Sequence, residues 1–413
     1  MAIVGQALTA PESGWRRYDN TDSRFIYNGT WTSATNSPYY NNSLQYSNDI
    51  NSFISFKFYG SKLRIIDEVN TDRSSNIKIT IDGVDYVYSD YGTSAHQILL
   101  FEKSDLLLGL HTVRISNMTN GVYYSFDAID IDDTGYLAHP TLPQKTDVES
   151  LNIGDVIPCK YIVSTSGNIG VFSEFGTCTS ALLPSIPVAV PNGLFYWVFV
   201  GYDAQNRMKF IADRIVQIAI SWNTLNASGI VSGLPVNFVD NNFYNQYIRL
   251  MTGGVVATQD IDNEWDRIIV NSTLNGLITS GDNNIWHYGN SYPTLISTTS
   301  ASANTSRIMR GLTSNINYSS SIDVATATNG FRPVLIIERK VIVKHLIKDG
   351  TDLKTISGGN LVKVCNTTDD ETIRKGAYLS SGMNNLSLWT NSLLTQVTTK
   401  PPYVCTYRTP KDY

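Results

Sequence analysis

The chain has 413 residues, enough for about two to four domains with separate hydrophobic cores. Only 16% of the residues are charged and the formal net charge is −5, which excludes nucleic acid as an expected partner, because binding to a phosphate backbone needs clustered lysine and arginine. Polarity comes instead from 24 tyrosines and from Asn, Ser, Thr and Gly, a mixture typical of β-rich proteins with adhesive surfaces.

The N-terminal stretch MAIVGQALTAPESGW lacks a basic segment followed by an apolar one. No later stretch reaches the roughly 18 apolar residues of a membrane helix. We therefore expect no signal-peptide export and no membrane insertion.

Short strands are predicted up to about Tyr136. In Phe53–Tyr59 and Ile77–Ile81, apolar residues alternate with polar ones, which is the period of a half-buried strand. Asp82-Gly83 follows the second run and predicts a hairpin. With further strands expected at 96–101, 111–115 and 125–131, the pattern indicates an antiparallel β-sandwich of about eight strands over residues 1–138.

The order of five pieces in residues 14–136 resembles the galactose-binding-like jelly rolls that serve as carbohydrate-binding modules. These pieces are SRFIYNGTWTS, SPYYNNSLQYS, ISFKFYGSKLRII, IKITIDG and FDAIDID. The resemblance implies a saccharide ligand. Sugar rings pack one apolar face on an aromatic ring while their hydroxyls bond to fixed polar groups. The candidate binding residues in this segment are Tyr39, Tyr40, Asn42 and Tyr46, with Trp31 interpreted as core.

Residues 139–146 (HPTLPQK and the next residue) have the composition of a semi-rigid linker. A second domain is expected over residues 147–339, with short strands and long polar loops. Within it, Ile215–Ala227 fits either a helix or a strand. Cys159 and Cys178 are spaced so that a disulfide is allowed, but small buried hydrophobes are the favoured interpretation.

The second domain ends on NGFRPVLII (Asn329–Ile337), where an arginine precedes an apolar run. With NEWDRIIVNSTLNG, SGDNNIWHYGN and SRIMRGL, this segment resembles the receptor-binding domains of tail fibres and minor structural proteins from phages of Gram-positive bacteria. It is more distantly similar to the C-type-lectin-like α+β fold. The resemblance implies that Arg310 and Arg332 are buried or half-buried structural cations held by carboxylates such as Asp266 or Glu264 and by backbone carbonyls, since an unpaired buried guanidinium is costly. An alternative for Arg332 is an edge-strand position with its charge in water.

A second candidate saccharide site in the central segment consists of Asp282, Asn284, Trp286, Tyr288 and Tyr292, with Trp265 and Trp222 interpreted as core. For Trp286 a core position is the alternative. The five histidines are scattered and no nucleophile motif is present, so no catalytic residue is predicted and the chain is expected not to be an enzyme. The acidic cluster of Asp127, Asp130, Asp132 and Asp133 is interpreted as a solvated face, with a calcium site or a catalytic pair as alternatives. No metal and no cofactor are predicted.

Residues 340–413 are expected to form a small β-rich unit with a turn at Asp349-Gly350. Together these features predict a mainly β virion protein, assembled in the host cytoplasm, that adheres to a host cell-surface glycan. A homotrimer that also contacts other virion proteins is expected by resemblance. Two alternatives stay open, namely a non-adhesive head-fibre, decoration or baseplate component and a glycan-degrading enzyme.

Overall fold

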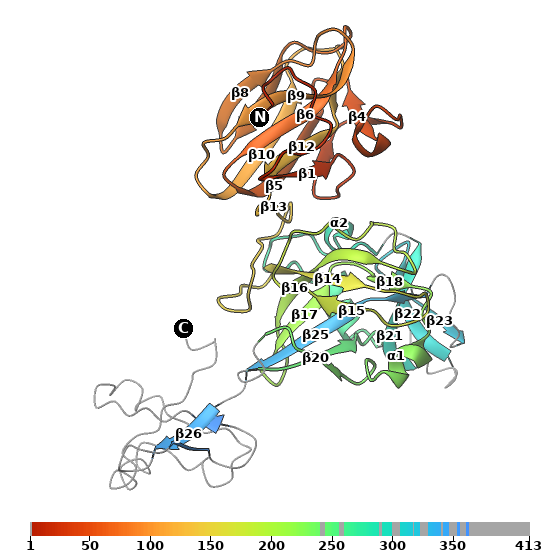
Figure 1. Cartoon of the computed structure of the whole chain (residues 1–413). Helices are drawn as coiled ribbons and strands as arrows, with labels where there is room; N and C mark the ends of the chain where they lie inside the picture. Colours follow the sequence, from red (N-terminus) through yellow and green to blue (C-terminus); the bar gives the residue numbers. More distant parts are fainter. Residues whose placement is uncertain are drawn as a thin grey trace.

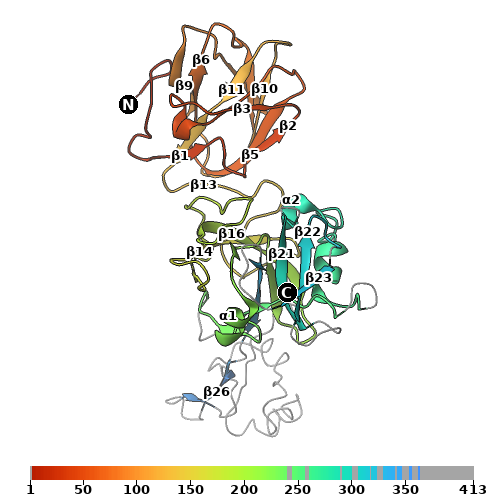
Figure 2. The same ribbon diagram turned by 90° about the vertical axis from the view of Figure 1, so that its right-hand side faces the viewer.

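The computed structural model describes residues 2–239, 244–255, 260–288, 291–299, 306–316, 318–322, 329–339, 342–346, 353–355 and 361–362. The fold is mainly β, which confirms the predicted class. Figure 1 shows an N-terminal β-sandwich, in red to orange, next to a larger central domain in yellow to blue, with the short strand β13 at the junction. Figure 2 shows the same arrangement after a quarter turn.

The sandwich contains two larger sheets and one small one. The first sheet has the order β1-β12-β6-β9, the second β13-β5-β10-β7-β8 with β2 added on β5, and the third β11-β4-β3. The strand bounds are β1 Trp15–Asp19, β2 Ile26–Asn28, β3 Thr32–Ala34, β4 Leu44–Ser47, β5 Phe53–Gly60, β6 Leu63–Val69, β7 Ile77–Ile81, β8 Val84–Tyr88, β9 Ala95–Lys103, β10 Gly109–Asn117, β11 Tyr124–Phe126, β12 Ala128–Asp132 and β13 Tyr136–Leu137. Thirteen strands thus replace the eight expected, because short edge strands carry too few residues to show a period.

The alternation predicted for β5 is confirmed, since Ile54, Phe56 and Phe58 are all at most 2% exposed. They pack in one core with residues of both larger sheets. The hairpin between β7 and β8 is also confirmed. Its two central residues, Asp82 and Gly83, have φ values of 49° and 82°, as a type I′ turn requires.

A seven-stranded sheet, in the order β15-β14-β16-β17-β25-β20-β19, forms the middle of the central domain. A five-stranded sheet, β18-β24-β21-β22-β23, packs beside it. The strand bounds are β14 Val156–Ile162, β15 Val171–Ser173, β16 Asn192–Tyr202, β17 Met208–Ala212, β18 Gln217–Ile218, β19 Leu234–Pro235, β20 Tyr244–Leu250, β21 Tyr292–Thr299, β22 Ser306–Leu312, β23 Tyr318–Ile322, β24 Gly330–Phe331 and β25 Pro333–Arg339. The C-type-lectin-like assignment of this domain stays a prediction.

Both faces of the seven-stranded sheet are covered, which explains its continuous apolar runs. On β16, Phe195 and Trp197 belong to one hydrophobic cluster, while Tyr196 and Val198 belong to the cluster on the opposite face. The run VLII that follows Arg332 divides its side chains between the same two clusters in the same way.

The ambiguous segment Ile215–Ala227 contains both kinds of element. It begins with strand β18 and ends in helix α1 (Trp222–Ala227), whose N-cap Ser221 accepts a hydrogen bond from the Thr224 amide at 2.9 Å. Among the described residues, the other helical elements are a 3₁₀ turn of the sandwich (Tyr40–Asn42), a π-helical turn (Trp265–Val270) and α2 (Asn283–Trp286).

The connector contacts the central domain at several points, including backbone hydrogen bonds between Val156 and residues 143 and 145. His139 is buried, and its Nδ1 accepts hydrogen bonds from the amides of Thr141 and Leu142 at 3.2 and 2.9 Å. Leu142 is itself part of the central core. The segment predicted to be a semi-rigid linker is therefore docked on the central domain.

Arg24 joins the sandwich to the central domain. Its side chain is fully buried, pairs with Asp22, and donates to the Leu137 carbonyl at 3.0 Å and to Cys178 Sγ at 3.5 Å. Cys178 belongs to the central domain and is a free thiol, as is Cys159, so no disulfide joins them. A buried cation therefore stands at the domain junction.

In the C-terminal part, β26 (Ile342–Leu346) lies between β27 (Leu353–Thr355) and β28 (Leu361–Val362). The predicted turn at Asp349-Gly350 lies outside the described residues. Among the helices that the structure describes, none has the length and apolar character needed to cross a membrane.

Candidate functional site

Four loops of the sandwich meet at one end of its sheets, which we call the loop end. They follow strands β3, β6, β8 and β10. Backbone hydrogen bonds lock three of them together, because Ser74 N donates to Tyr123 O at 2.8 Å and Asn70 N donates to Asp90 O at 3.0 Å. Loops held in this way by a rigid scaffold are the usual position of binding residues.

A row of aromatic and charged side chains lies at the loop end. Tyr39 contacts His96 edge to face, with ring centroids 5.4 Å apart, and its hydroxyl donates to Glu68 at 3.3 Å. Glu68 is also paired with Arg73. The Arg73 guanidinium in turn lies over the rings of Tyr46 and Tyr123, at 5.9 and 5.7 Å from their centroids.

The members of this row are half-buried, with the exception of Glu68, which is 2% exposed. Tyr46 and Tyr123 contact each other with centroids 5.6 Å apart. Burial, and then the charge of Glu68, raises the pKa of Tyr39 to about 12, so its hydroxyl keeps its proton. The row therefore presents aromatic faces together with fixed polar groups, the combination expected of a saccharide site.

Three buried carboxyl groups, Asp67, Asp90 and Asp127, lie below the row. Burial raises the pKa of Asp90 to about 8 and that of Asp127 to about 7, and it raises that of Asp67 well above its usual value. Burial therefore favours the protonated, uncharged form of these three carboxyl groups more than water does. Asp127 Oδ1 accepts from the Tyr40 amide at 3.0 Å and so fixes the turn that carries Tyr39 and Tyr40.

The structure separates the four N-terminal candidates. Tyr39 and Tyr46 belong to the row, whereas Tyr40 lies under the guanidinium of Arg17, 5.2 Å from its ring centroid, on the side that faces the central domain. Asn42 is exposed and has a left-handed backbone with φ of 61°. Trp31 packs on Tyr27 and Tyr124 at the edge of the core.

The sequence reasoning missed Glu68, Arg73, His96 and Tyr123. The only local signal was DEVNTDR, where charged residues directly follow the apolar run of β6. Tyr123 lies in the loop after β10 and His96 on strand β9, both far from Arg73 in the sequence, and an isolated bridge brings Tyr123 to Arg73.

The second candidate set does not assemble as expected. Trp286 is 0% exposed and belongs to the core of the central domain, so its proposed role in stacking on a sugar is wrong. Asp282 caps α2 by accepting from the Asn284 amide at 2.9 Å, and the Tyr288 hydroxyl donates to Gly281 O at 2.6 Å. Asn284 is exposed and Tyr292 is half-buried on β21.

Arg310 is buried and forms a two-pronged pair with Asp266, with Nη1–Oδ2 and Nη2–Oδ1 distances of 2.9 and 2.6 Å. Nη1 also donates to Gly253 O at 2.7 Å. Trp265 is 0% exposed and donates from Nε1 to Asn315 O at 2.7 Å. Glu264 pairs with Arg249 and Lys209 rather than with Arg310 or Arg332.

Arg332 is fully buried and lies against backbone carbonyls, not in water. It donates to the carbonyls of Ala212, Asp213 and Trp286 at 2.9, 2.8 and 2.6 Å. Burial lowers its pKa to about 9, since no carboxylate bonds to it directly. It thus ties strand β17 and helix α2 to the start of β25.

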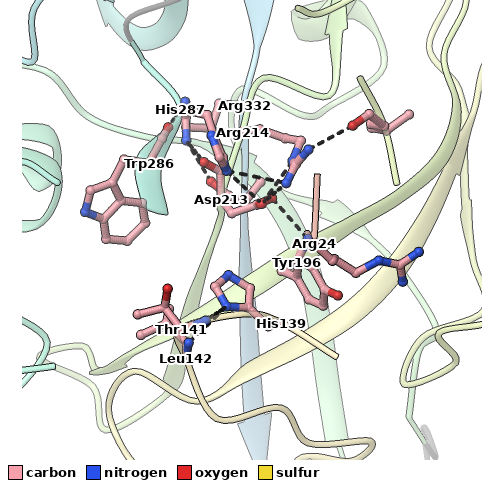
Figure 3. A network of polar contacts seen from close by, with 12 residues as sticks. Arg24, His139, Thr141, Leu142, Tyr196, Asp213, Arg214, Trp286, His287 and Arg332 are labelled. Atoms are coloured by element: carbon pink, nitrogen blue, oxygen red, sulfur yellow. Dashed lines mark hydrogen bonds and ion pairs between the residues drawn. The ribbon is translucent and has the colours of Figure 1, made fainter. Parts of the chain in front are cut away.

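Beside Arg332, Asp213 stands between Arg214 and His287, as Figure 3 shows. Burial opposes ionisation of Asp213, but the charge of Arg214 holds its pKa below the usual range. Burial and the nearby Arg214 lower the pKa of His287 to about 3, and burial does the same for His139. Bases with so low a pKa take up almost no proton near neutrality. We therefore assign a structural role to this network of Arg332, Asp213, Arg214, His287 and His139.

The acidic cluster of β12 was interpreted as a solvated face, and this is wrong for two of its members. Asp127 and Asp130 are 0% exposed, and Asp130 is paired with Arg17 at 2.7 Å. Asp132 accepts from the Ser61 amide and from the Ser61 hydroxyl, and Asp133 is exposed. In the part of the chain that the structure describes, no group of three or more His, Cys, Asp or Glu side chains is placed to hold a metal ion.

These features describe a β protein whose loops suit interaction with carbohydrate, and the comparisons with known proteins agree at this level. No family model matches the chain. It is 31% identical over 112 residues to an A type blood N-acetyl-alpha-D-galactosamine deacetylase of Flavonifractor plautii. It is 27% identical over 142 residues to an A type blood alpha-D-galactosamine galactosaminidase of the same organism.

These matches involve 26% and 34% of this chain but only 14% and 12% of the two relatives. Both relatives are named as enzymes, and this finding contradicts the expectation that the chain is not an enzyme. Among solved structures, a family 35 carbohydrate binding module from Clostridium thermocellum is 16% identical with a TM-score of 0.24, and covers 28% of this chain and 98% of its own. A family two carbohydrate esterase from Cellvibrio japonicus is 18% identical with a TM-score of 0.24, over 32% of this chain and 37% of its own.

Proposed function

We propose that the sandwich binds a glycan that ends in galactosamine or its N-acetyl form, and that the chain acts as part of a glycan-degrading protein. The observation that carries the binding proposal is the row of Tyr39, His96, Arg73, Tyr46 and Tyr123 at the loop end. The named activities of the two relatives support the choice of sugar and the degradative role.

Different residues of the row can make apolar and polar contacts with a sugar. The half-buried rings of Tyr46 and Tyr123 offer apolar surface to a sugar ring beside the Arg73 guanidinium, which lies over both of them. Arg73, fixed by Glu68, and the Tyr39 hydroxyl offer polar groups whose positions are set before the ligand arrives. Such preorganisation lowers the entropic cost of binding.

The binding proposal is tested by titration calorimetry of the intact chain with an oligosaccharide that ends in N-acetylgalactosamine. We expect the Tyr46→Ala variant to bind about fivefold more weakly, because an aromatic contact contributes about 1 kcal/mol. The matched control is Tyr59→Ala, since Tyr59 lies at the opposite end of β5 and stacks on Tyr136 with centroids 5.3 Å apart. Equal affinities of wild type and the Tyr46→Ala variant would refute this site.

The degradative role has a separate test. The intact chain is incubated with the same oligosaccharide, and the products are followed by mass spectrometry. Loss of an acetyl group or of the terminal sugar supports the proposal. Binding without any product would mean that the chain binds the glycan but does not degrade it.

The virion role stays a prediction from the motif resemblance. One observation favours it as the second candidate, because contacts join the four central motifs: Arg310 pairs with Asp266, the Arg332 guanidinium lies over the Trp265 ring at 6.0 Å, and Arg332 donates to Trp286 O. Immunogold labelling of phage particles from a host that carries this sequence tests that placement, and particles without label would exclude it.

A further inference from the structure

We propose that His111 is a pH-sensitive clamp, which fixes the loop between β9 and β10 while its imidazole ring is charged. His111 lies near the start of β10, at the end of the sandwich opposite the loop end, and is 6% exposed. Three connections meet around it, namely the β5–β6 turn, the β7–β8 hairpin and the β9–β10 loop. Each of them directs an oxygen atom at the ring.

Both ring nitrogens of His111 face hydrogen-bond acceptors. Nδ1 lies 2.6 Å from Oδ2 of Asp82, while Nε2 lies 3.1 Å from Gly60 O and 2.8 Å from Leu107 O. A neutral imidazole carries hydrogen on only one nitrogen, so the other nitrogen would direct a lone pair at an acceptor. Only the imidazolium form donates on both sides. The geometry therefore indicates a charged ring.

Asp82 supplies the negative charge that balances this ring. Its Oδ1 also accepts from the Thr112 amide at 2.8 Å. Partial burial opposes ionisation of Asp82, but the hydrogen bonds from Thr112 and His111 hold its pKa below the usual value. The carboxyl group is therefore ionised near neutral pH and cannot donate a proton to Nδ1.

The other charged groups of the surrounding elements have partners of their own. From β5 the neighbour of His111 is the uncharged Phe58 ring, with centroids 5.1 Å apart. Lys103, at the end of β9, pairs with Asp105 of the loop at 2.6 Å. In the β5–β6 turn, the Lys62 ammonium lies over an aromatic ring and Asp132 accepts from two amides of the turn. Asp82 is thus the charged partner of His111.

Loss of the second proton would release the β9–β10 loop and not the hairpin. A neutral ring keeps its hydrogen on Nδ1, because a carboxylate is a stronger acceptor than a carbonyl. Nε2 then directs a lone pair at Gly60 O and Leu107 O. The bond from Leu106 N to Ser61 O, at 3.0 Å, remains, so the loop loosens without unfolding. Leu107 and Leu108 are 88% and 66% exposed, so the clamp controls the position of an exposed apolar surface.

NMR of the intact chain with ¹⁵N-labelled histidine tests the charge on the ring. We expect both ring nitrogens of His111 to carry hydrogen at pH 7 and one of them to lose it at higher pH. His139 and His287 serve as internal references for the neutral form, since burial lowers the pKa of each to about 3. The His111→Gln variant assigns the signal. A neutral His111 ring at pH 7 would overturn the proposal.

Hydrogen exchange of residues 104–110, corrected for the pH dependence of exchange in an unstructured peptide, tests the release. Wild type should exchange severalfold faster once the ring is neutral, and His111→Gln should show one corrected rate at every pH. Asp82→Asn is the matched second variant, because Asn-Gly also forms a type I′ turn while the charge is lost. Its ring titration and loop release should both move to lower pH by about one unit. A wild-type loop with pH-independent corrected exchange, or transitions that Asp82→Asn leaves in place, would also overturn the proposal.

Discussion

The pair Arg310–Asp266 allows a quantitative test of how the central domain is stabilised. Both side chains are buried, at 2% and 10% exposure, and two short hydrogen bonds join them. Removal of one partner from such a pair leaves an uncompensated charge and costs about 3–5 kcal/mol. We therefore expect the Asp266→Ala and Arg310→Met variants each to lose about that much free energy of unfolding.

The double variant Arg310→Met with Asp266→Leu distinguishes pairing from packing. Replacement of a buried ion pair by apolar side chains of similar volume is often close to neutral. The double variant should thus be more stable than either single variant, by about 2 kcal/mol or more.

The assay is guanidinium unfolding followed by tryptophan fluorescence, with free energies from linear extrapolation. Four described tryptophans, at positions 197, 222, 265 and 286, report on the central domain. Scanning calorimetry separates the sandwich transition, which should not move and serves as the internal control. Single variants that cost less than about 1 kcal/mol, or a double variant that costs the sum of the two, would refute the reasoning.

Three further predictions follow from the structure. Burial raises the pKa of Asp90 to about 8, so the folded sandwich favours the protonated acid, and its stability should fall as the pH rises from about 4 to about 8; Asp90→Asn should reduce the slope of this profile in thermal melts, while Asp67 and Asp127, whose pKa values burial also raises, keep the rest of it. Ser221→Ala removes the N-cap of α1 and should cost about 1 kcal/mol in chemical unfolding of the central domain, while Ser232→Ala in the following loop should cost much less. Arg332→Met leaves three buried carbonyls without a donor and should lower the melting temperature of the central domain more than that of the sandwich, as calorimetry would show.

Local patterns predicted individual strands and turns, because each such pattern corresponds to one element. The alternation in β5 and the Asp82-Gly83 turn needed no tertiary information. The burial of Arg332 could also be predicted from the sequence, because an arginine directly before an apolar strand must find partners inside the protein.

The site could be predicted only in part, since its residues come from three loops and from strands β4, β6 and β9. Tyr39 and Tyr46 were found because tyrosine and asparagine cluster locally in SPYYNNSLQYS. Arg73 and Tyr123 were not found, because a bridge between two distant loops brings them together. Trp286 was misassigned because a tryptophan beside exposed asparagines has the same local pattern whether its ring faces the solvent or the core.

A glycan array probed with the intact chain tests the central claim most directly. Wild type should be retained on glycans that end in galactosamine or N-acetylgalactosamine, and a variant with Tyr39→Ala and Tyr46→Ala should lose most of that signal while staying folded. Absence of wild-type binding to every such glycan, or equal binding by the double variant, would contradict the account.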